Sequence, residues 1–226
     1  MDALSAIHLR HGVLRFQDRL VEPALIQQVL EAAVAAPSPA NLQPWAFIVV
    51  TQAGLARQVA HYLIRIQQEK VFTELLENPP ADTTRLMDLY EGFDRAPCFI
   101  LVCLEPKNRF ARPEHAAVLR DWYLACLGAA MQNLMVAATA LGLGTRWFGG
   151  FALDAGGEFL QRLLAIPPVV EIVAVTPLGY SNEPSKERSH QESAAVSDFR
   201  RGDPRALRRL LRGRLSLDGL VHYDQW

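Results

Sequence analysis

Hydrophobic residues recur along the chain with two different periods, so the pattern predicts both helices and strands. Apolar side chains at helical spacing follow Pro23, which fits the first turn of a helix, and Pro37 ends this segment. The longest helical pattern ends at Gly142, and at ~1.5 Å per residue this helix is roughly 40 Å long. We predict helices over about residues 23–36, 55–77, 114–141 and 158–164.

Three further segments are typical of β-strands, and a short extended piece covers Thr145–Phe148. The run Cys98–Leu104 is apolar throughout, which predicts a strand buried on both faces. The other two strands are expected at about residues 46–51 and 170–178. Strands and helices do not alternate regularly, and no repeat or linker divides the chain. We therefore expect one α+β domain, residues 1–226, with a small sheet covered by helices on both sides.

Composition excludes several classes of protein. Half of the residues are hydrophobic and the formal net charge is −1, so no global field favours nucleic acid or an anionic membrane. The longest apolar runs, such as residues 99–104, are far shorter than the ~20 residues that span a bilayer. Cys98, Cys103 and Cys126 lack metal-ligand spacing, which favours buried thiols in a reducing cytosol. We expect a cytoplasmic protein that binds no metal, nucleic acid or membrane.

The common motifs of nucleotide-binding and hydrolytic enzymes are missing. Gly142 and Gly144 could begin a dinucleotide fingerprint, but Trp147 holds the third glycine position and the pair follows a helix. The sequence has no Walker phosphate loop, no HExxH and no GxSxG segment, and its six histidines have no partners at metal-ligand spacing. These absences argue against a Rossmann domain, a metal enzyme and a serine hydrolase.

Four separated segments together resemble the FMN-dependent nitroreductase family. They are RHGVLRF at 10–16, APSPANLQPW at 36–45, LGLGTRWFGGF at 141–151, and GY at 179–180, which leads to KER at 186–188. The resemblance implies a nitroreductase-like fold with a central mixed or antiparallel sheet and a C-terminal tail that reaches the partner subunit. It also implies a homodimer with FMN at the interface and NAD(P)H as co-substrate.

The resemblance assigns roles to residues of these segments. Arg10, Lys186 and Arg188 would hold the FMN phosphate, because guanidinium forks and lysine charges bind phosphate oxygens. Residues 147–150 would pass along the flavin near N5, where glycines let the backbone approach. Surface cations and a plain glycine turn are the alternative interpretations. The residues expected to bind the cofactor are Arg10, His11, Gly12, Pro37, Ser38, Pro39, Asn41, Gln43, Trp147, Phe148, Gly149, Gly150, Lys186 and Arg188.

The residue types in the loop before the first strand are suited to a flavin-binding site. Its prolines stiffen it, and Ser38, Asn41 and Gln43 offer hydrogen-bonding side chains. By the family pattern, Ser38 lines the cofactor and Asn41 approaches polar edges of the flavin. The alternative is a helix-to-strand turn in which Asn41 bonds its own backbone. We assign Trp45 to the core rather than to the site.

The first segment departs from the family pattern. Where the family usually has a serine and then an arginine or lysine, this chain has Gly12 and Leu14. Arg15 cannot replace the missing cation, because neighbouring side chains point in different directions. We interpret Arg146 as a structural residue that forms an ion pair or an interface contact.

The C-terminal part of the sequence has two further features. Residues 204–212 form a basic amphipathic pattern that is typical of a docked surface helix, although a nucleic-acid helix is conceivable. The aromatic end, residues 220–226, resembles the family tail that wraps a neighbouring subunit. The stretch from about residue 65 to 95 is expected to form much of a substrate lid.

These features predict an NAD(P)H-dependent FMN oxidoreductase with ping-pong kinetics. Its small-molecule acceptor would be a nitroaromatic, a quinone or another conjugated, electron-poor compound, and no side chain is assigned as an acid or base. Two alternatives remain open. One is a flavin-dependent oxidase or dehydrogenase, or a flavin-cleaving relative, that uses O₂. The other is a non-enzymatic flavin-binding or regulatory protein.

Overall fold

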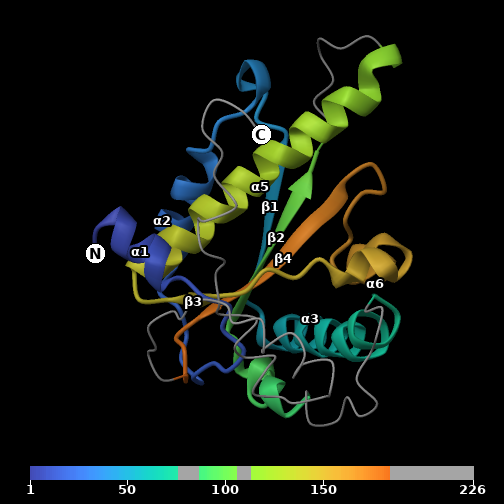
Figure 1. Cartoon of the computed structure of the whole chain (residues 1–226). Helices are drawn as coiled ribbons and strands as arrows, with labels where there is room; N and C mark the ends of the chain where they lie inside the picture. Colours follow the sequence, from blue (N-terminus) through green and yellow to red (C-terminus); the bar gives the residue numbers. More distant parts are fainter. Residues whose placement is uncertain (76–86, 106–112, 184–226) are drawn as a thin grey trace, which may run out of the picture.

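A computed structural model describes residues 1–75, 87–105 and 113–183 of the chain. Within these ranges four strands form one antiparallel sheet in the order β1-β2-β4-β3 (Figure 1). The predicted α+β class and its antiparallel sheet are confirmed. Three strands lie within one residue of their predicted bounds, whereas the fourth is shorter than the expected extended piece. The strands are β1 (Trp45–Val50), β2 (Cys98–Leu104), β3 (Gly144–Thr145) and β4 (Glu171–Gly179).

Strand β2 lies between β1 and β4, and all of its residues are buried. Successive side chains of a strand point to opposite faces of the sheet. Phe99 and Leu101 accordingly belong to one hydrophobic core, while Ile100 and Val102 belong to another. The predicted burial of this strand on both faces is confirmed, and each face of the sheet carries its own core.

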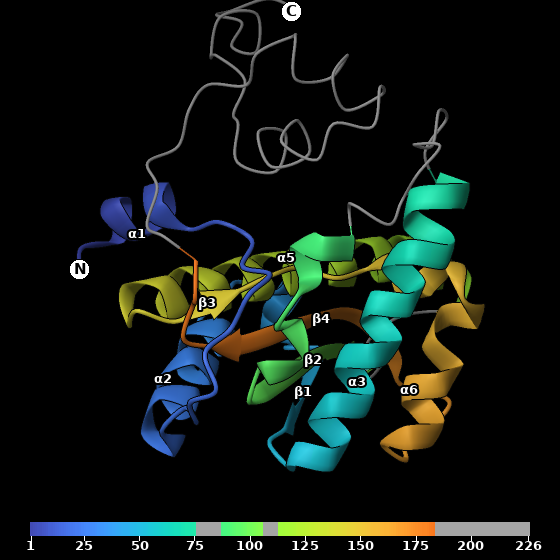
Figure 2. The same ribbon diagram turned by 90° about the horizontal axis from the view of Figure 1, so that it is seen from below.

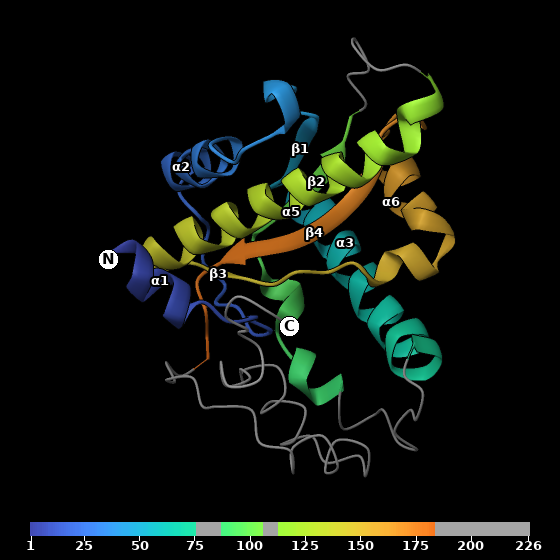
Figure 3. The same ribbon diagram turned by 45° about the horizontal axis from the view of Figure 1, so that its top comes forward.

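Helices α2 (Pro23–Val34) and α5 (Ala116–Ala140) cover one face of the sheet (Figure 3). Pro23 occupies the first turn of α2, as predicted, because a helix leaves its first N–H groups unpaired. Helix α5 crosses the domain, and Leu127, Met131 and Leu134 on its inner side are fully buried. The α2–α5 layer therefore seals the core on this side of the sheet.

Helix α5 is long and apolar enough to cross a membrane by length and composition alone. The same properties describe the core helix of a globular domain. Of its most apolar stretch, 44% is buried inside the protein, and the helix packs against α2 and three strands of the sheet. These contacts are those of a core helix.

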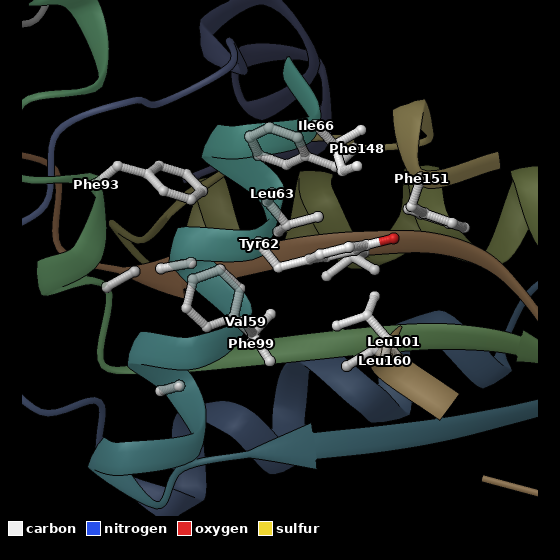
Figure 4. Packing of buried hydrophobic residues seen from close by; sticks show 14 of the residues in the cluster. Val59, Tyr62, Leu63, Ile66, Phe93, Phe99, Leu101, Phe148, Phe151 and Leu160 are labelled. Atoms are coloured by element: carbon white, nitrogen blue, oxygen red, sulfur yellow. The ribbon is translucent and has the colours of Figure 1, made fainter. Parts of the chain in front are cut away.

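The other face of the sheet is covered by α3 (Ala53–Ile66) and α6 (Glu158–Leu163) (Figure 2). The helix predicted from residue 55 to 77 changes geometry partway, because its α-helical turns end at Ile66 and a π-helical segment, η2 (Gln67–Leu75), continues. Figure 4 shows the aromatic core beneath these helices. There the ring of Phe93 lies edge-on to Phe99 and to Phe148.

Short 3₁₀ turns connect these elements. They are η1 (Pro39–Asn41), η3 (Asp88–Tyr90), η4 (Phe93–Arg95), η5 (Pro113–His115), η6 (Gly150–Leu153) and η7 (Ala155–Gly157). The basic pattern at 204–212 and the aromatic tail lie outside the described residues, as do residues 76–86 of the expected lid.

One helix, α1 (Ala3–Leu9), was not predicted by the hydrophobic pattern. Its side chains give little periodic signal, because Ala6 is its one buried residue. A local signal was present in Asp2, whose carboxylate accepts a hydrogen bond from the backbone N–H of Ser5 at 3.0 Å and caps the helix. Helix α1 packs beside the C-terminal half of α5 (Figure 1).

The three cysteines are free and buried, as expected from their apolar surroundings. Burial raises the pKa of the Cys98 and Cys103 thiols to about 12, because a thiolate loses its hydration in the core. These thiols are therefore neutral at physiological pH and serve as small core side chains.

Adjacent glycines at the start of η6 have different packing. A Cβ atom added to Gly150 would lie 2.5 Å from Cγ2 of Val71, so η2 can approach this backbone only because the side chain is absent. A Cβ added to Gly149 would meet nothing closer than 3.8 Å, at Nε1 of Trp147. Gly150 is thus required by packing, whereas a side chain at Gly149 would make only an ordinary van der Waals contact.

We expect Gly150→Ala to lower the free energy of unfolding by about 1–3 kcal/mol, because the added methyl overpacks the contact with Val71. The matched variant Gly149→Ala should change stability by less than about 0.5 kcal/mol. Urea unfolding followed by circular dichroism measures both. The double variant Gly150→Ala/Val71→Ala should cost less than the sum of the two single changes. Wild-type stability of Gly150→Ala would contradict this packing account.

Candidate functional site

Two segments that lie far apart in the sequence meet at one end of the sheet. Gly12 pairs with Thr145 in a parallel bridge, and the N–H of Val13 donates to the Thr145 carbonyl at 2.9 Å. This close approach requires a glycine at 144, because a Cβ there would lie 2.7 Å from Cγ2 of Val13. The structure therefore brings the first and third sequence motifs together.

The fourth motif joins them through Glu183. Its Oε1 accepts hydrogen bonds from the backbone N–H of Leu14 at 2.7 Å and of Arg15 at 3.3 Å. Phe16 also pairs with Ser181 in an isolated bridge. The chain that leads to Lys186 and Arg188 thus starts beside the first motif, while these two cations lie outside the described residues.

A cavity of about 250 Å³ opens where the three segments meet. It is lined by Leu9, His11 and Val13 of the first segment, by Gly142 after α5, and by Glu183 after β4. The ring of His11 contacts the Leu9 carbonyl through Nδ1 at 3.1 Å, while its buried Nε2 has no partner among the described residues.

Buried polar atoms without partners concentrate around this junction. Within the described ranges five buried side-chain nitrogen or oxygen atoms lack a hydrogen bond, and four belong to His11, Arg15, Thr145 and Arg146. A buried polar group without a partner costs about 1–3 kcal/mol. Such a cluster fits a polar ligand that completes these hydrogen bonds, and its donors fit an anionic one.

Arg146 is the cation that points into this junction. Its Nη2 donates to the hydroxyl of Tyr90 at 3.2 Å, and its guanidinium lies 5.6 Å and 5.2 Å from the ring centroids of Tyr90 and Phe148. Burial raises the pKa of Tyr90, and the charge of Arg146 partly opposes this rise, so the hydroxyl stays neutral. Among the described residues no carboxylate lies within ion-pair distance of Arg146. The ion pair proposed from the sequence is thus not found there.

The side chains of Leu14 and Arg15 lie elsewhere. Leu14 is buried in the core beneath α3, with 6% of its surface exposed. Arg15 points to η3, where its Nη2 donates to the Asp88 carbonyl at 3.0 Å and lies 3.8 Å from the Glu91 carboxylate. As expected, Arg15 does not take the place of a cation at position 14.

Residues 147–150 run from this junction toward α3. Phe148 pairs with Val175 through two backbone hydrogen bonds of 2.9 and 3.0 Å, and its side chain is buried in the core. Trp147 keeps 43% of its surface exposed, and Gly149 is exposed as well. The open positions of this segment are therefore 147 and 149, while 148 and 150 support the fold.

The loop from Pro37 to Gln43 is held by its own side chains. The Ser38 hydroxyl accepts a hydrogen bond from the N–H of Gln43 at 3.0 Å, and the Asn41 side-chain oxygen accepts from Nε2 of Gln43 at 3.2 Å. Ala40, Asn41 and Gln43 have φ angles of 47°, 54° and 47°, in the left-handed region that non-glycine residues rarely adopt. One interpretation of the sequence was a turn in which the Asn41 side chain bonds its own backbone. In the structure the Asn41 side chain instead accepts a hydrogen bond from the side chain of Gln43.

Within one chain this loop does not meet the junction at Gly12. Trp45, which follows the loop, pairs with Leu104 at one end of β2, whereas the Gly12–Thr145 bridge is level with Cys98 at the other end. Figure 1 shows the two regions at opposite ends of the sheet. A seven-residue strand at ~3.3 Å per residue is roughly 20 Å long. One chain therefore carries two separate groups of the expected cofactor-binding residues.

Comparison with known proteins identifies relatives of this chain. A protein of Methanothermobacter thermautotrophicus, provisionally named NADH dehydrogenase/NAD(P)H nitroreductase, is 31% identical over 81% of this chain and 79% of its own length. A protein of Archaeoglobus fulgidus with the same provisional name is 27% identical, over 85% of this chain and 91% of that protein.

Solved structures share the fold. A nitroreductase with bound FMN from Desulfitobacterium hafniense superposes with a TM-score of 0.62 at 24% identity and covers 86% of this chain and 96% of its own. The sequence model of the Nitroreductase family matches residues 9–180, which include the junction, the loop at 37–43 and the whole sheet. This chain belongs to the Nitroreductase family.

Proposed function

We propose that the protein is a homodimeric FMN-dependent oxidoreductase that uses NAD(P)H to reduce small, conjugated, electron-poor acceptors such as nitroaromatics or quinones. The observation that carries the proposal is the group of buried polar atoms of His11, Thr145 and Arg146 that have no hydrogen-bond partner among the described residues. Family membership and the provisional names of the relatives support the same reaction class.

The donors of this cluster fit FMN. A flavin presents hydrogen-bonding oxygens and nitrogens along one edge, and its phosphate is an anion. His11, Thr145 and Arg146 offer polar atoms that no described residue satisfies. Arg10, at the C-terminal end of α1, is assigned to the phosphate together with Lys186 and Arg188, by analogy with the family.

The distance between the two groups of predicted site residues supports a homodimer. In a two-fold dimer, one protomer would contribute residues 10–12 and 147–150, and its partner would contribute residues 37–43. Helix α5 offers a suitable contact surface, because Val118 and Trp122 are 50% and 54% exposed and a Cβ at Gly128 would touch nothing within 4 Å. Large exposed apolar side chains of this kind are typical of interfaces.

The bound flavin would accept hydride from NAD(P)H and pass electrons to the second substrate, which is the basis of ping-pong kinetics. The residues of this chain would bind and orient it. Gly149 is exposed, and its missing side chain leaves room for close approach to the backbone. Trp147 presents an exposed ring beside it. The free thiols fit a reducing cytoplasm.

We expect the purified protein to be yellow and to release FMN on denaturation. NADH or NADPH should bleach the flavin without oxygen, and a quinone should restore its absorbance. Full absorbance with both nucleotides would contradict the reductase and favour the oxidase or regulatory alternatives. Absence of any flavin binding would contradict the whole proposal.

Arg10→Ala should weaken FMN binding about 10- to 100-fold, because a charge-assisted hydrogen bond contributes roughly 1.5–3 kcal/mol. Quenching of FMN fluorescence by apoprotein measures the dissociation constant. Arg162→Ala is the matched control, since Arg162 pairs with Glu158 on α6 and its side chain is 72% exposed. Equal FMN affinity in Arg10→Ala and the wild type would remove Arg10 from the site.

Trp122→Glu should weaken the dimer, because association would bury a charge on the outer face of α5. Light scattering at micromolar concentration should show a dimer for the wild type and a monomer for the variant. Val169→Glu places the same charge on another exposed apolar residue, before β4, and should remain dimeric. A fully dimeric Trp122→Glu variant would place the interface elsewhere.

A further inference from the structure

We propose that Arg146, whose side chain lies beside Gly12, is a cofactor-binding residue whose positive charge favours the reduced, anionic flavin. This inference rests on the proposed function, because it requires a bound flavin. The chain then supplies from residue 146 the charge that its first motif lacks at residue 14.

Neither Gly12 nor Leu14 carries a positively charged side chain that could contact a flavin. Gly12 has no side chain, and the side chain of Leu14 is buried in the core. The side chain of Arg15 is directed to the Asp88 carbonyl and the Glu91 carboxylate. The cationic side chain that lies beside Gly12 comes from another segment.

That charge belongs to Arg146. A Cβ atom built on Gly12 would lie 3.4 Å from Nη1 and 3.6 Å from Cγ of Arg146. The arginine side chain thus runs along the face of Gly12 where a larger residue would place its own side chain. Gly12 has no positive φ that would require a glycine. A Cβ at this position would be in ordinary van der Waals contact with Arg146, and further side-chain atoms would compete with the guanidinium for space.

The guanidinium is held in place before any ligand binds. The Tyr90 hydroxyl accepts one of its hydrogen bonds, and the rings of Tyr90 and Phe148 lie within cation–π range. Both rings are buried, at 4% exposure each, so their positions are fixed by the core. A cation held in this way loses little freedom when it contacts a ligand.

The charge of Arg146 is also left without compensation. Among the residues that the structure describes, its buried Nε has no hydrogen-bond partner and no carboxylate pairs with it. The nearby Glu183 bonds the backbone of Leu14 and Arg15, and Glu91 pairs with Arg15. A partly buried, unpaired cation is costly, and an anionic ligand would offset that cost.

Reduction adds negative charge to the pyrimidine end of a flavin. A fixed cation that touches this end stabilises the reduced form more than the oxidised form, so it raises the midpoint potential of the bound cofactor. Arg146 should therefore bind reduced FMN more tightly than oxidised FMN. Tyr90 acts as a positioning residue, because it orients the guanidinium.

The test compares the affinity for oxidised FMN with the midpoint potential in the full-length protein. Fluorescence quenching gives the first, and equilibration with a reference dye gives the second. Arg146→Gln should weaken binding of reduced FMN at least tenfold more than binding of oxidised FMN, which lowers the potential by about 30 mV or more for a two-electron couple. Arg146→Lys should keep much of the potential, because it keeps the charge.

Two further variants test the positioning. Tyr90→Phe keeps the ring and removes the hydroxyl, so it should lower the potential less than Arg146→Gln does. Gly12→Ser should also lower the potential, because its side chain crowds the guanidinium. Arg162→Gln on α6 is the control and should leave both the affinity and the potential unchanged.

The outcomes separate the two proposals. If the wild type binds no FMN, the proposed function fails and this inference fails with it. If the wild type binds FMN but Arg146→Gln keeps the wild-type potential, the inference alone is overturned. An equal loss of affinity for both flavin forms also overturns it. If circular dichroism shows that Arg146→Gln does not fold, the test falls to Gly12→Ser, and a wild-type potential in that variant overturns the inference.

Discussion

The close contact between the backbone at residues 12–16 and the end of the sheet determines most of what this structure can do. It depends on the bridge from Gly12 to Thr145 and on the missing side chain at Gly144. Glu183 ties the same backbone to the segment after β4. Near this contact, buried polar atoms of His11, Thr145 and Arg146 have no hydrogen-bond partner among the described residues. Folded proteins rarely leave such atoms unpaired, so their concentration at one place supports the proposed binding site.

The hydrophobic pattern predicted the elements that carry strong periodicity. Strand β2 and helix α5 bury many side chains, and their sequence patterns are therefore unambiguous. Helix α1 was missed because it buries little more than Ala6, and its cap at Asp2 is a weak signal on its own. The π-helical turns after Ile66 were missed because helical periodicity in a sequence does not distinguish one helical geometry from another.

The site could be predicted only in part. The family motifs indicated which segments matter, and the structure joins three of them around Gly12. The structure places the loop at 37–43 at the opposite end of the sheet from the Gly12 junction. Local sequence patterns do not reveal this separation. The environment of Arg146 was also hidden, because Tyr90 lies far away in the sequence and reaches Arg146 only through tertiary packing. The sequence also does not distinguish Gly149 from its neighbour Gly150, although only a side chain at Gly150 would clash with Val71.

The contact between Gly12 and Arg146 also constrains how this sequence can change over evolutionary time. A Cβ at residue 12 would already contact the Arg146 side chain at 3.4 Å, so a side chain that extends beyond Cβ would compete with the arginine for space. The effects of substitutions at these positions are therefore not independent. A lineage that acquired a larger residue at 12 while arginine was still at 146 would pass through a crowded intermediate, whereas shortening residue 146 first would avoid it. Steric crowding therefore favours a change at residue 146 before a change at residue 12.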